Sequence, residues 1–435
     1  MSDKDFQVGG PRATYVLVIC SALYGVNYMD RQVLSVVLEP MRLDLGLTDT
    51  QAGMLQTVFL LSMGALSMPV AYWVDRWSRS KMIAAMAVLW SIATFATGLG
   101  KSYIGVLVPR MVTGVGEAGF SSGSTALIAA SYPETERARK LGWFNMSIIL
   151  GIGVGLVGGG YLSENFGGWR TPFYVFAVPG IILGILALFM QDYKNPPREA
   201  HEKPANIIDN VLTVLRVPAM RWIYIGYGMQ IMLAFSIMVW VPALLMRRFE
   251  IGEGAAGIVM AVGGALGAPG ALVGGRIADW WQSRHPAGWM RFAAYTQGVA
   301  TVCAMVSVLA VVFLHKGSYD EVSIWLVVGA LAFSLFSMLI IAGIPAVGAS
   351  TQALVPPNLK GMAWGLAVLF QYLLGGGWGP ALAGRLSDMF GGGANGLGYA
   401  LMITASAGFI CFACWIVSSM RYPDDAKEVA ARNAG

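Results

Sequence analysis

The chain has 435 residues, of which 56% are hydrophobic and only 12% are charged, and its formal net charge is +5. Its mean hydropathy is +0.62. A charged share about half that of ordinary soluble proteins excludes a disordered chain, a coiled coil and a disulfide-framed secreted module. The composition instead predicts an integral membrane protein.

Apolar runs long enough to cross a bilayer as a helix, which takes about 20 residues, recur along the chain. Twelve spans are predicted, at residues 14–38, 50–74, 81–99, 103–130, 140–163, 171–190, 221–246, 254–279, 290–314, 321–349, 359–386 and 395–420. Because the number is even, both termini lie on the same side of the membrane.

Basic residues are unevenly divided between the two sides of the predicted spans. The segments on the side of the termini hold 20 Lys and Arg, and those on the other side hold 7. Cytoplasmic loops carry such an excess, so both termini are expected in the cytoplasm, with the chain in an inner (cytoplasmic) or plasma membrane. The excess of Lys and Arg in cytoplasmic segments explains the positive net charge of the chain, so no nucleic-acid partner is expected.

The longest interruption, residues 191–220, contains Pro196, Pro197 and Pro204 and mixed charges and is typical of a linker. It separates an N-terminal bundle (1–190) from a C-terminal bundle (221–420), which a tail (421–435) follows. Apolar residues at helical spacing within the linker predict a short helix, either in the cytoplasmic membrane interface or solvated. They are Ile207, Ile208, Val211, Leu212 and Leu215.

A small residue followed four positions later by an acid closes every third span, beginning with the second. The copies are Ala71–Asp75, Gly160–Glu164, Gly275–Asp279 and Gly384–Asp388. On the predicted topology they alternate between the two sides, which indicates three-helix units repeated with inversion. The predicted fold class is therefore an all-α membrane protein with two pseudo-symmetric six-helix bundles. A purely structural role in helix packing is compatible with a gating role.

Four charged residues lie well inside predicted spans, away from the span ends: Asp30 and Arg31 in the first, and Arg110 and Glu117 in the fourth. Each costs about 2.5–3.5 kcal/mol at the bilayer centre, so they must pair or face a hydrated cavity. Arg110 and Glu117 are two turns apart on one helix face, and Asn27 lies one turn before Asp30 and Arg31.

This set of charges suits proton coupling, because burial favours a neutral carboxyl whereas a nearby arginine favours the ionised form. We expect Asp30, with Glu117 as partner or second site, to carry the proton. Arg31 and Arg110 would serve as counter-ions or as anchors for an anionic substrate. The alternative is a permanent ion-pair network that only fixes helix packing.

Candidate substrate contacts are polar or aromatic residues near the middle of spans: Asn27, Arg31, Arg110, Ser121, Asn145, Gln230, Trp240, Trp364 and Gln371. Since spans of the second half contain no comparable charge, that half is expected to shape an apolar side of the cavity, or its tryptophans simply pack. No predicted span contains histidine and no phosphate-binding loop is found. We therefore expect no catalytic residue, no cofactor and no metal, which leaves an intramembrane lipid-modifying enzyme as a remote alternative.

Two motifs resemble the major facilitator superfamily. Asp75, Arg76, Arg79 and Lys81 are similar to its loop motif after the second span, and Arg110, Gly114, Gly116 and Ala118 to its fourth-span motif. The resemblance implies two bundles that alternate access to a central site. It also implies a gating role for the Asp75–Lys81 loop.

Two branches compete. The segment Asn27–Arg31, the run from Gln51 to Phe59 and the sequence Gly114–Ala118 with its following serines resemble the Spinster branch, which implies lipid-like substrates. Parts of the same motifs are similar to the anion:cation symporter branch, which implies sugar-acid import. The sequence therefore predicts a proton-coupled secondary active transporter of a small amphipathic or organic-anion substrate. Its partners would be the lipid bilayer, that substrate and protons, and it would act as a monomer.

Overall fold

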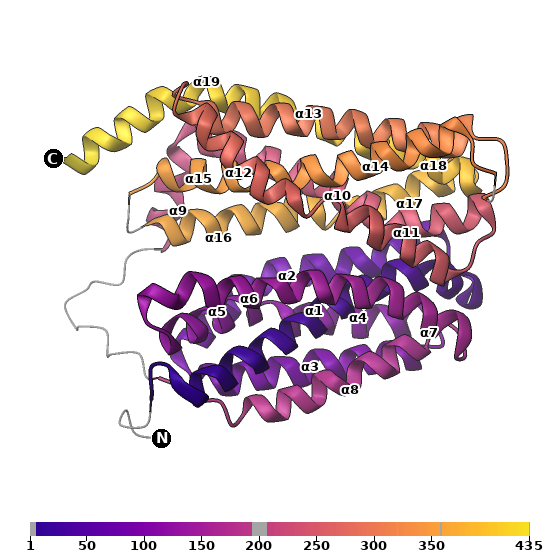
Figure 1. The fold of residues 1–435 in the computed structure, drawn as a ribbon, viewed down its shortest axis with the longest axis horizontal. Coiled ribbons are helices and arrows are strands. Elements are labelled where there is room, and N and C mark those ends of the chain that lie inside the picture. Colours follow the sequence, from indigo (N-terminus) through magenta and orange to yellow (C-terminus); the bar gives the residue numbers. More distant parts are fainter. Residues whose placement is uncertain (1–5, 194–206, 320, 357–358, 435) are drawn as a thin grey trace. The chain divides into compact units, whose positions relative to one another are not determined.

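The computed structural model of the chain describes residues 6–193, 207–319, 321–356 and 359–434. Every regular element in this part of the chain is helical, and short π-helical turns, labelled η, interrupt several of the long helices. Within each compact unit the helices run alongside one another (Figure 1). The predicted all-α fold class is confirmed.

The first six predicted spans form the first unit, which residues 251–261 also join. Its helices are α1 (Gly10–Leu45), α2 (Asp49–Arg76), α3 (Arg79–Leu99), α4 (Tyr103–Glu117), α5 (Phe120–Ser131), α6 (Glu134–Gly153), η2 (Val154–Gly158), α7 (Gly159–Asn165) and α8 (Thr171–Ala187).

The second unit holds the linker helix and the remaining spans, apart from residues 251–261. Its helices are α9 (Ile207–Arg216), α10 (Pro218–Phe249), the end of α11 (Glu253–Ala265), α12 (Pro269–Gln282), α13 (Gly288–Val308), η3 (Leu309–Leu314), α14 (Ile324–Ala342), α15 (Ile344–Ala353), α16 (Lys360–Phe370), η5 (Gln371–Gly376), α17 (Gly379–Met389), α18 (Gly393–Ala405) and α19 (Ala407–Ala434).

The helices follow the predicted order of twelve spans. Eight described helices are long and apolar enough to cross a membrane by length and composition alone. The other four spans are α1, α2, α8 and the pair α4 and α5. Helix α8 has only 17 residues, and the fourth span breaks between Glu117 and Phe120 into two shorter helices. The twelve-span, two-bundle architecture therefore holds, and the fourth span is interrupted where its glycines gather.

Glycines on α4 determine how closely this helix approaches its neighbours. A Cβ atom at Gly114 would collide with the Phe59 carbonyl of α2, and one at Gly116 with the Trp90 backbone of α3. Glycine is the residue that lets two helix backbones approach so closely in a membrane protein. These contacts hold α4, and with it Arg110 and Glu117, directly against α2 and α3.

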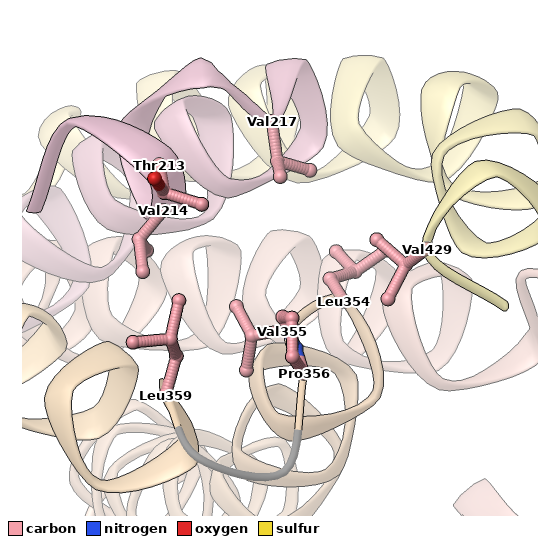
Figure 2. A pocket seen from close by; sticks show the side chains of 8 residues that line it. All are labelled: Thr213, Val214, Val217, Leu354, Val355, Pro356, Leu359 and Val429. Atoms are coloured by element: carbon pink, nitrogen blue, oxygen red, sulfur yellow. The ribbon is translucent and has the colours of Figure 1, made fainter. Parts of the chain in front are cut away.

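The linker helix α9 packs against the second unit. Val214 is completely buried, and Val211 and Leu215 pack against the core of that unit, whereas Leu212 is 43% exposed. The helix predicted in the linker is therefore present, and its apolar face is used mainly for protein packing. Figure 2 shows the cavity of about 30 Å³ that remains at this junction, lined by Thr213, Val214, Val217, Leu354, Val355, Pro356, Leu359 and Val429.

The predicted tail after residue 420 continues as the end of helix α19. The Ala219 backbone N–H donates to Asp425 Oδ2 at 2.8 Å, and the Ser418 hydroxyl donates to the Ala219 carbonyl at 3.1 Å. Helix α10 begins at Pro218 without a side-chain cap of its own. Asp425 thus supplies the cap for α10 from the opposite end of the unit's sequence.

The repeated acids at helix ends find different partners. Glu164 Oε2 accepts a hydrogen bond from the Gly254 backbone N–H at 3.0 Å, inside the first unit. Asp279 Oδ1 accepts one from the Trp289 indole at 3.0 Å, inside the second unit. Both acids therefore tie the end of one helix to the start of another, which is the structural role considered for the repeat. The side chain of Asp75 lies outside the described part of the structure.

Asp44, at the end of α1, ties that helix to the segment before α8. Its Oδ2 atom accepts from the Trp169 indole at 3.0 Å and from Arg170 Nη1 at 2.7 Å. The indole hydrogen bond, followed by the guanidinium, holds the pKa of Asp44 below its usual value. Asp44 lies beyond the predicted first span, so it meets water as well as these partners.

We expect Asp44→Asn to lower the midpoint of thermal unfolding in detergent by about 1–2 °C near neutral pH. A depressed pKa in the folded state stabilises the protein above the unfolded-state value of about 3.9 and loses its effect as the pH falls through the folded-state value. The difference from wild type should therefore shrink steadily on acidification. Glu134→Gln, at an exposed ion pair on α6, is the control. A difference that stayed constant on acidification would contradict this assignment.

Candidate functional site

An ion pair joins the first and fourth spans inside the first unit. Arg31 Nε lies 2.6 Å from Glu117 Oε2, with the Glu117 side chain fully buried and that of Arg31 16% exposed. Helix α1 supplies Arg31 and, one residue earlier, Asp30. Helix α4 supplies Glu117 from its last turn and Arg110 from two turns earlier. The structure thus brings together the four charges that the sequence places inside spans.

Asp30 is fully buried and has a neutral hydrogen-bond partner. The Thr94 hydroxyl of α3 donates to Asp30 Oδ2 at 3.3 Å. Its other oxygen, Oδ1, has no hydrogen-bond partner among the described atoms. Asp30 also interacts electrostatically with the Glu117 carboxyl and the Arg110 guanidinium. Unlike Glu117, Asp30 therefore has no guanidinium bonded directly to its carboxyl.

Arg110 is fully buried between α4 and α2. Its Nη2 atom donates to Gln56 Oε1 at 3.2 Å, and its guanidinium lies 4.8 Å from the centre of the Phe59 ring. The Arg31 guanidinium lies 5.9 Å from the same ring and 4.9 Å from that of Tyr28. Aromatic faces stabilise desolvated cations, so Phe59 helps to hold two arginines in one small volume.

Asn27 completes the cluster on α1. Its side chain is fully buried and lies beside the Glu117 carboxyl. Within the described part of the chain, neither of its amide atoms reaches hydrogen-bonding geometry, and the same holds for Glu117 Oε1 and for Nε and Nη1 of Arg110. Buried polar atoms of this kind ordinarily find partners. The cluster therefore offers both donors and acceptors to a proton, water or a polar ligand.

The remaining substrate candidates fall into three groups by burial. Ser121 on α5 and Asn145 on α6 are exposed, whereas Trp364 and Gln371 are partly exposed. Gln230 and Trp240 are buried within the second unit, where Gln230 donates to the Ile340 carbonyl at 3.1 Å and Trp240 to the Pro380 carbonyl at 2.9 Å. Both side chains satisfy backbone acceptors, which supports the packing alternative for Trp240.

The predicted gating loop is tied to the segment that follows α8. The Ser78 hydroxyl and the Ser80 backbone N–H donate to Asp192 Oδ2 at 2.6 and 3.2 Å, and Arg79 stacks over the Tyr193 ring at 4.4 Å. Lys81 is exposed. The side chains of Asp75 and Arg76 lie outside the described part of the structure, so their predicted gating role stays a prediction.

Sequence reasoning missed three contributors to these sites: Thr94, Gln56 and Asp192. Each is a polar residue that becomes relevant only through a partner on another helix. Gln56 lies within the run from Gln51 to Phe59 that carries the Spinster resemblance. For Thr94 and Asp192 the sequence offers only the weak signal of a polar residue inside or directly after an apolar run.

The twelve-span fold with a charge cluster inside its first bundle is the architecture of a multi-pass membrane transporter. A family model described as the Major Facilitator Superfamily matches residues 20–380. The chain therefore belongs to the major facilitator superfamily, as its motifs predicted.

Relatives within the superfamily support the Spinster resemblance. The chain is 29% identical over 430 residues to a protein named MFS-type efflux pump of Mycolicibacterium smegmatis, covering 97% of this chain and 96% of the relative. It is 25% identical over 451 residues to Protein spinster homolog 1 of Xenopus tropicalis, covering 97% and 83%. The Spinster-like character predicted from the motifs is confirmed.

Solved structures share the fold. A bacterial homologue of the human lysosomal transporter Spinster, in an inward-facing and unoccupied conformation, superposes with a TM-score of 0.84 at 22% identity, covering 96% of this chain and 99% of the other. A D-xylose-proton symporter superposes with a TM-score of 0.70 at 14% identity, covering 95% and 97%. At these identities the similarity concerns the fold alone.

We expect Glu117→Ala to destabilise the protein by about 3–5 kcal/mol, because it leaves the Arg31 guanidinium without its buried partner. Replacing both residues, as Arg31→Met with Glu117→Leu, should restore most of the loss, since an apolar pair needs no compensation. Thermal unfolding of the purified protein in detergent measures both effects. Glu136→Ala, in a mostly exposed ion pair on α6, serves as the control. A double variant no more stable than Glu117→Ala would contradict the pairing argument.

Proposed function

We propose that the protein is a proton-coupled secondary active transporter that moves a small amphipathic organic anion by alternating access. The observation that carries this proposal is the buried cluster in which Arg31 and Glu117 pair at 2.6 Å beside Asp30 and Arg110. A cluster whose only task was to hold helices together would be replaceable by apolar residues at little cost. Ionisable groups inside spans are typical of proton and substrate pathways.

Charge balance suggests how a proton and an anion are coupled. With all four groups ionised, two carboxylates and two guanidiniums cancel. Protonation of Asp30 removes one negative charge and leaves the cluster with a net charge of +1, which attracts an anionic substrate. Loss of the proton restores neutrality and releases the anion. Both ligands would then bias the same equilibrium between conformations, as coupling requires.

The geometry favours Asp30 over Glu117 as the group that exchanges the proton. Glu117 is bonded directly to Arg31, so its protonation would break a charge-assisted hydrogen bond. Asp30 is bonded to the Thr94 hydroxyl, and its Oδ1 atom is available to carry a proton. Glu117 would then keep Arg31 in position until a substrate anion competes for the guanidinium.

The relatives support one substrate class over the other. Spinster homologues and an MFS-type efflux pump are similar to this chain along most of its length, which supports a lipid-like amphipath, such as a lysophospholipid, over a fully hydrophilic one. Sugar acids, the substrates implied by the competing motif resemblance, are the alternative. We further propose that both termini lie in the cytoplasm of an inner or plasma membrane, on the strength of the Lys and Arg bias.

The proposal predicts substrate-dependent proton flux in proteoliposomes that contain the purified protein and an internal pH-sensitive dye. Lysophospholipids should give saturable flux, whereas sugar acids should not. Asp30→Asn should lower the rate of proton-driven transport by about 100-fold, because a positioned group that transfers a proton typically contributes at least that factor to a rate. Substrate exchange without a proton gradient should persist, since the arginines that hold the anion remain.

Asp44→Asn is the matched control, because this acid of the same helix lies outside the cluster and its substitution should leave flux unchanged. Wild-type transport that ignored an imposed pH gradient would refute proton coupling. Full flux with Asp30→Asn but none with Glu117→Gln would show that Glu117, and not Asp30, carries the proton. Flux with sugar acids alone would establish the alternative substrate class.

A further inference from the structure

A groove of about 750 Å³ lies on the second unit, far in sequence from the charge cluster of the first. One wall comes from the end of α13 and from η3, through Met305, Leu309 and Phe313. The other comes from α18 and the turn after it, through Met402, Ile403 and Ser406. Successive residues of the first wall are four apart, so they form a straight stripe along one helix face.

Local helix geometry explains the groove. Helix α13 changes into the π-helical turn η3 at Leu309, and α18 ends at Ala405. Gly398 allows the two segments to approach closely near the end of η3, where a Cβ atom would lie 3.0 Å from the Val312 side chain. On the Met305 side of this contact, the side chains of the two segments do not fill the space between them.

The groove is apolar and has the length of one membrane leaflet. No charged residue lines it, and the Ser406 hydroxyl is satisfied by the Ile403 carbonyl at 2.6 Å. From Met305 to Phe313 the wall extends about 12 Å at 1.5 Å per residue, against about 15 Å for half of a hydrocarbon core. A ligand with polar groups along its length would leave them unsatisfied here, whereas a hydrocarbon chain would not.

Aromatic rings mark one end of the groove. The Tyr399 ring lies 4.8 Å from that of Phe313 and 5.9 Å from that of Phe390, and Tyr399 is 49% exposed. These residues lie at the ends of their spans, beside the connections that follow η3 and α17. Aromatic side chains gather at the membrane–water boundary, so this end is where a lipid head group would sit.

We propose that this groove binds one acyl chain of a bilayer phospholipid, from the leaflet on the side opposite the chain termini. The chain runs from the Tyr399 end toward Met305 and Ser406. The occupant comes from the membrane itself, because both walls belong to membrane-spanning helices. This site is independent of the proposed transport function, since none of its residues belongs to the charge cluster.

The test uses the full chain in vesicles of phosphatidylethanolamine and phosphatidylglycerol that contain a trace of phosphatidylcholine with a photoactivatable diazirine in one acyl chain. After irradiation, peptide mass spectrometry locates the labelled residues. We expect labelling concentrated on residues 305–313 and 399–406. Ile403→Trp, which fills the groove with an indole, should lower that labelling about threefold. The effect is modest because the acyl chain loses only van der Waals contacts with the groove and stays in an apolar surrounding.

Leu331→Trp is the matched control, because Leu331 on α14 is an exposed apolar residue of a span outside the groove. Leu309→Trp fills the groove from the other wall and keeps the test informative if Ile403→Trp fails to fold. Labelling spread over all lipid-facing helices in proportion to exposure would overturn the proposal. So would equal labelling in the groove-filling and control variants, or cross-links between two copies of the chain at these residues.

Discussion

Four charges inside the hydrocarbon region impose the strictest constraint on this fold. An ionised side chain there must meet an opposite charge or water, so α1 and α4 have to present Arg31 and Glu117 to each other. Their contact at 2.6 Å is possible because glycines on α4 remove the Cβ atoms that would keep this helix away from α2 and α3. Packing and electrostatics thus depend on the same short segment, Arg110–Glu117.

With all four groups ionised the cluster is neutral, but it is not fully bonded. Asp30, Asn27 and Arg110 keep buried polar atoms without partners among the described residues, while Thr94 and Gln56 hold one atom each of Asp30 and Arg110 in place. A network that only stabilised the fold would be expected to satisfy its members, because each buried unsatisfied group is costly. The unused hydrogen-bonding capacity is what a site needs if it is to bind and release protons and an anion.

The two units use their polar residues differently. In the first, polar side chains from four helices meet around the charges. In the second, Gln230 and Trp240 donate to backbone carbonyls of neighbouring segments, and Asp425 caps α10. The repeated acids also serve packing, since Glu164 and Asp279 each join two helix ends. Among the described residues, the buried charges therefore meet in the first unit, whereas these polar side chains of the second unit bond to the backbone.

The amino-acid pattern alone predicts the twelve spans, the all-helical class and the ionisable residues inside apolar runs, because run length and composition are local properties. It also indicated the superfamily through motifs that lie within single helices and loops. The folded chain is needed to see that Thr94 is the partner of Asp30, that Gln56 is the partner of Arg110 and that Asp192 accepts a hydrogen bond from Ser78. Each of these contacts joins segments far apart in the chain. Glycine contacts and helix breaks set how each helix is rotated and how closely it approaches its neighbours, and no local sequence pattern predicts that geometry.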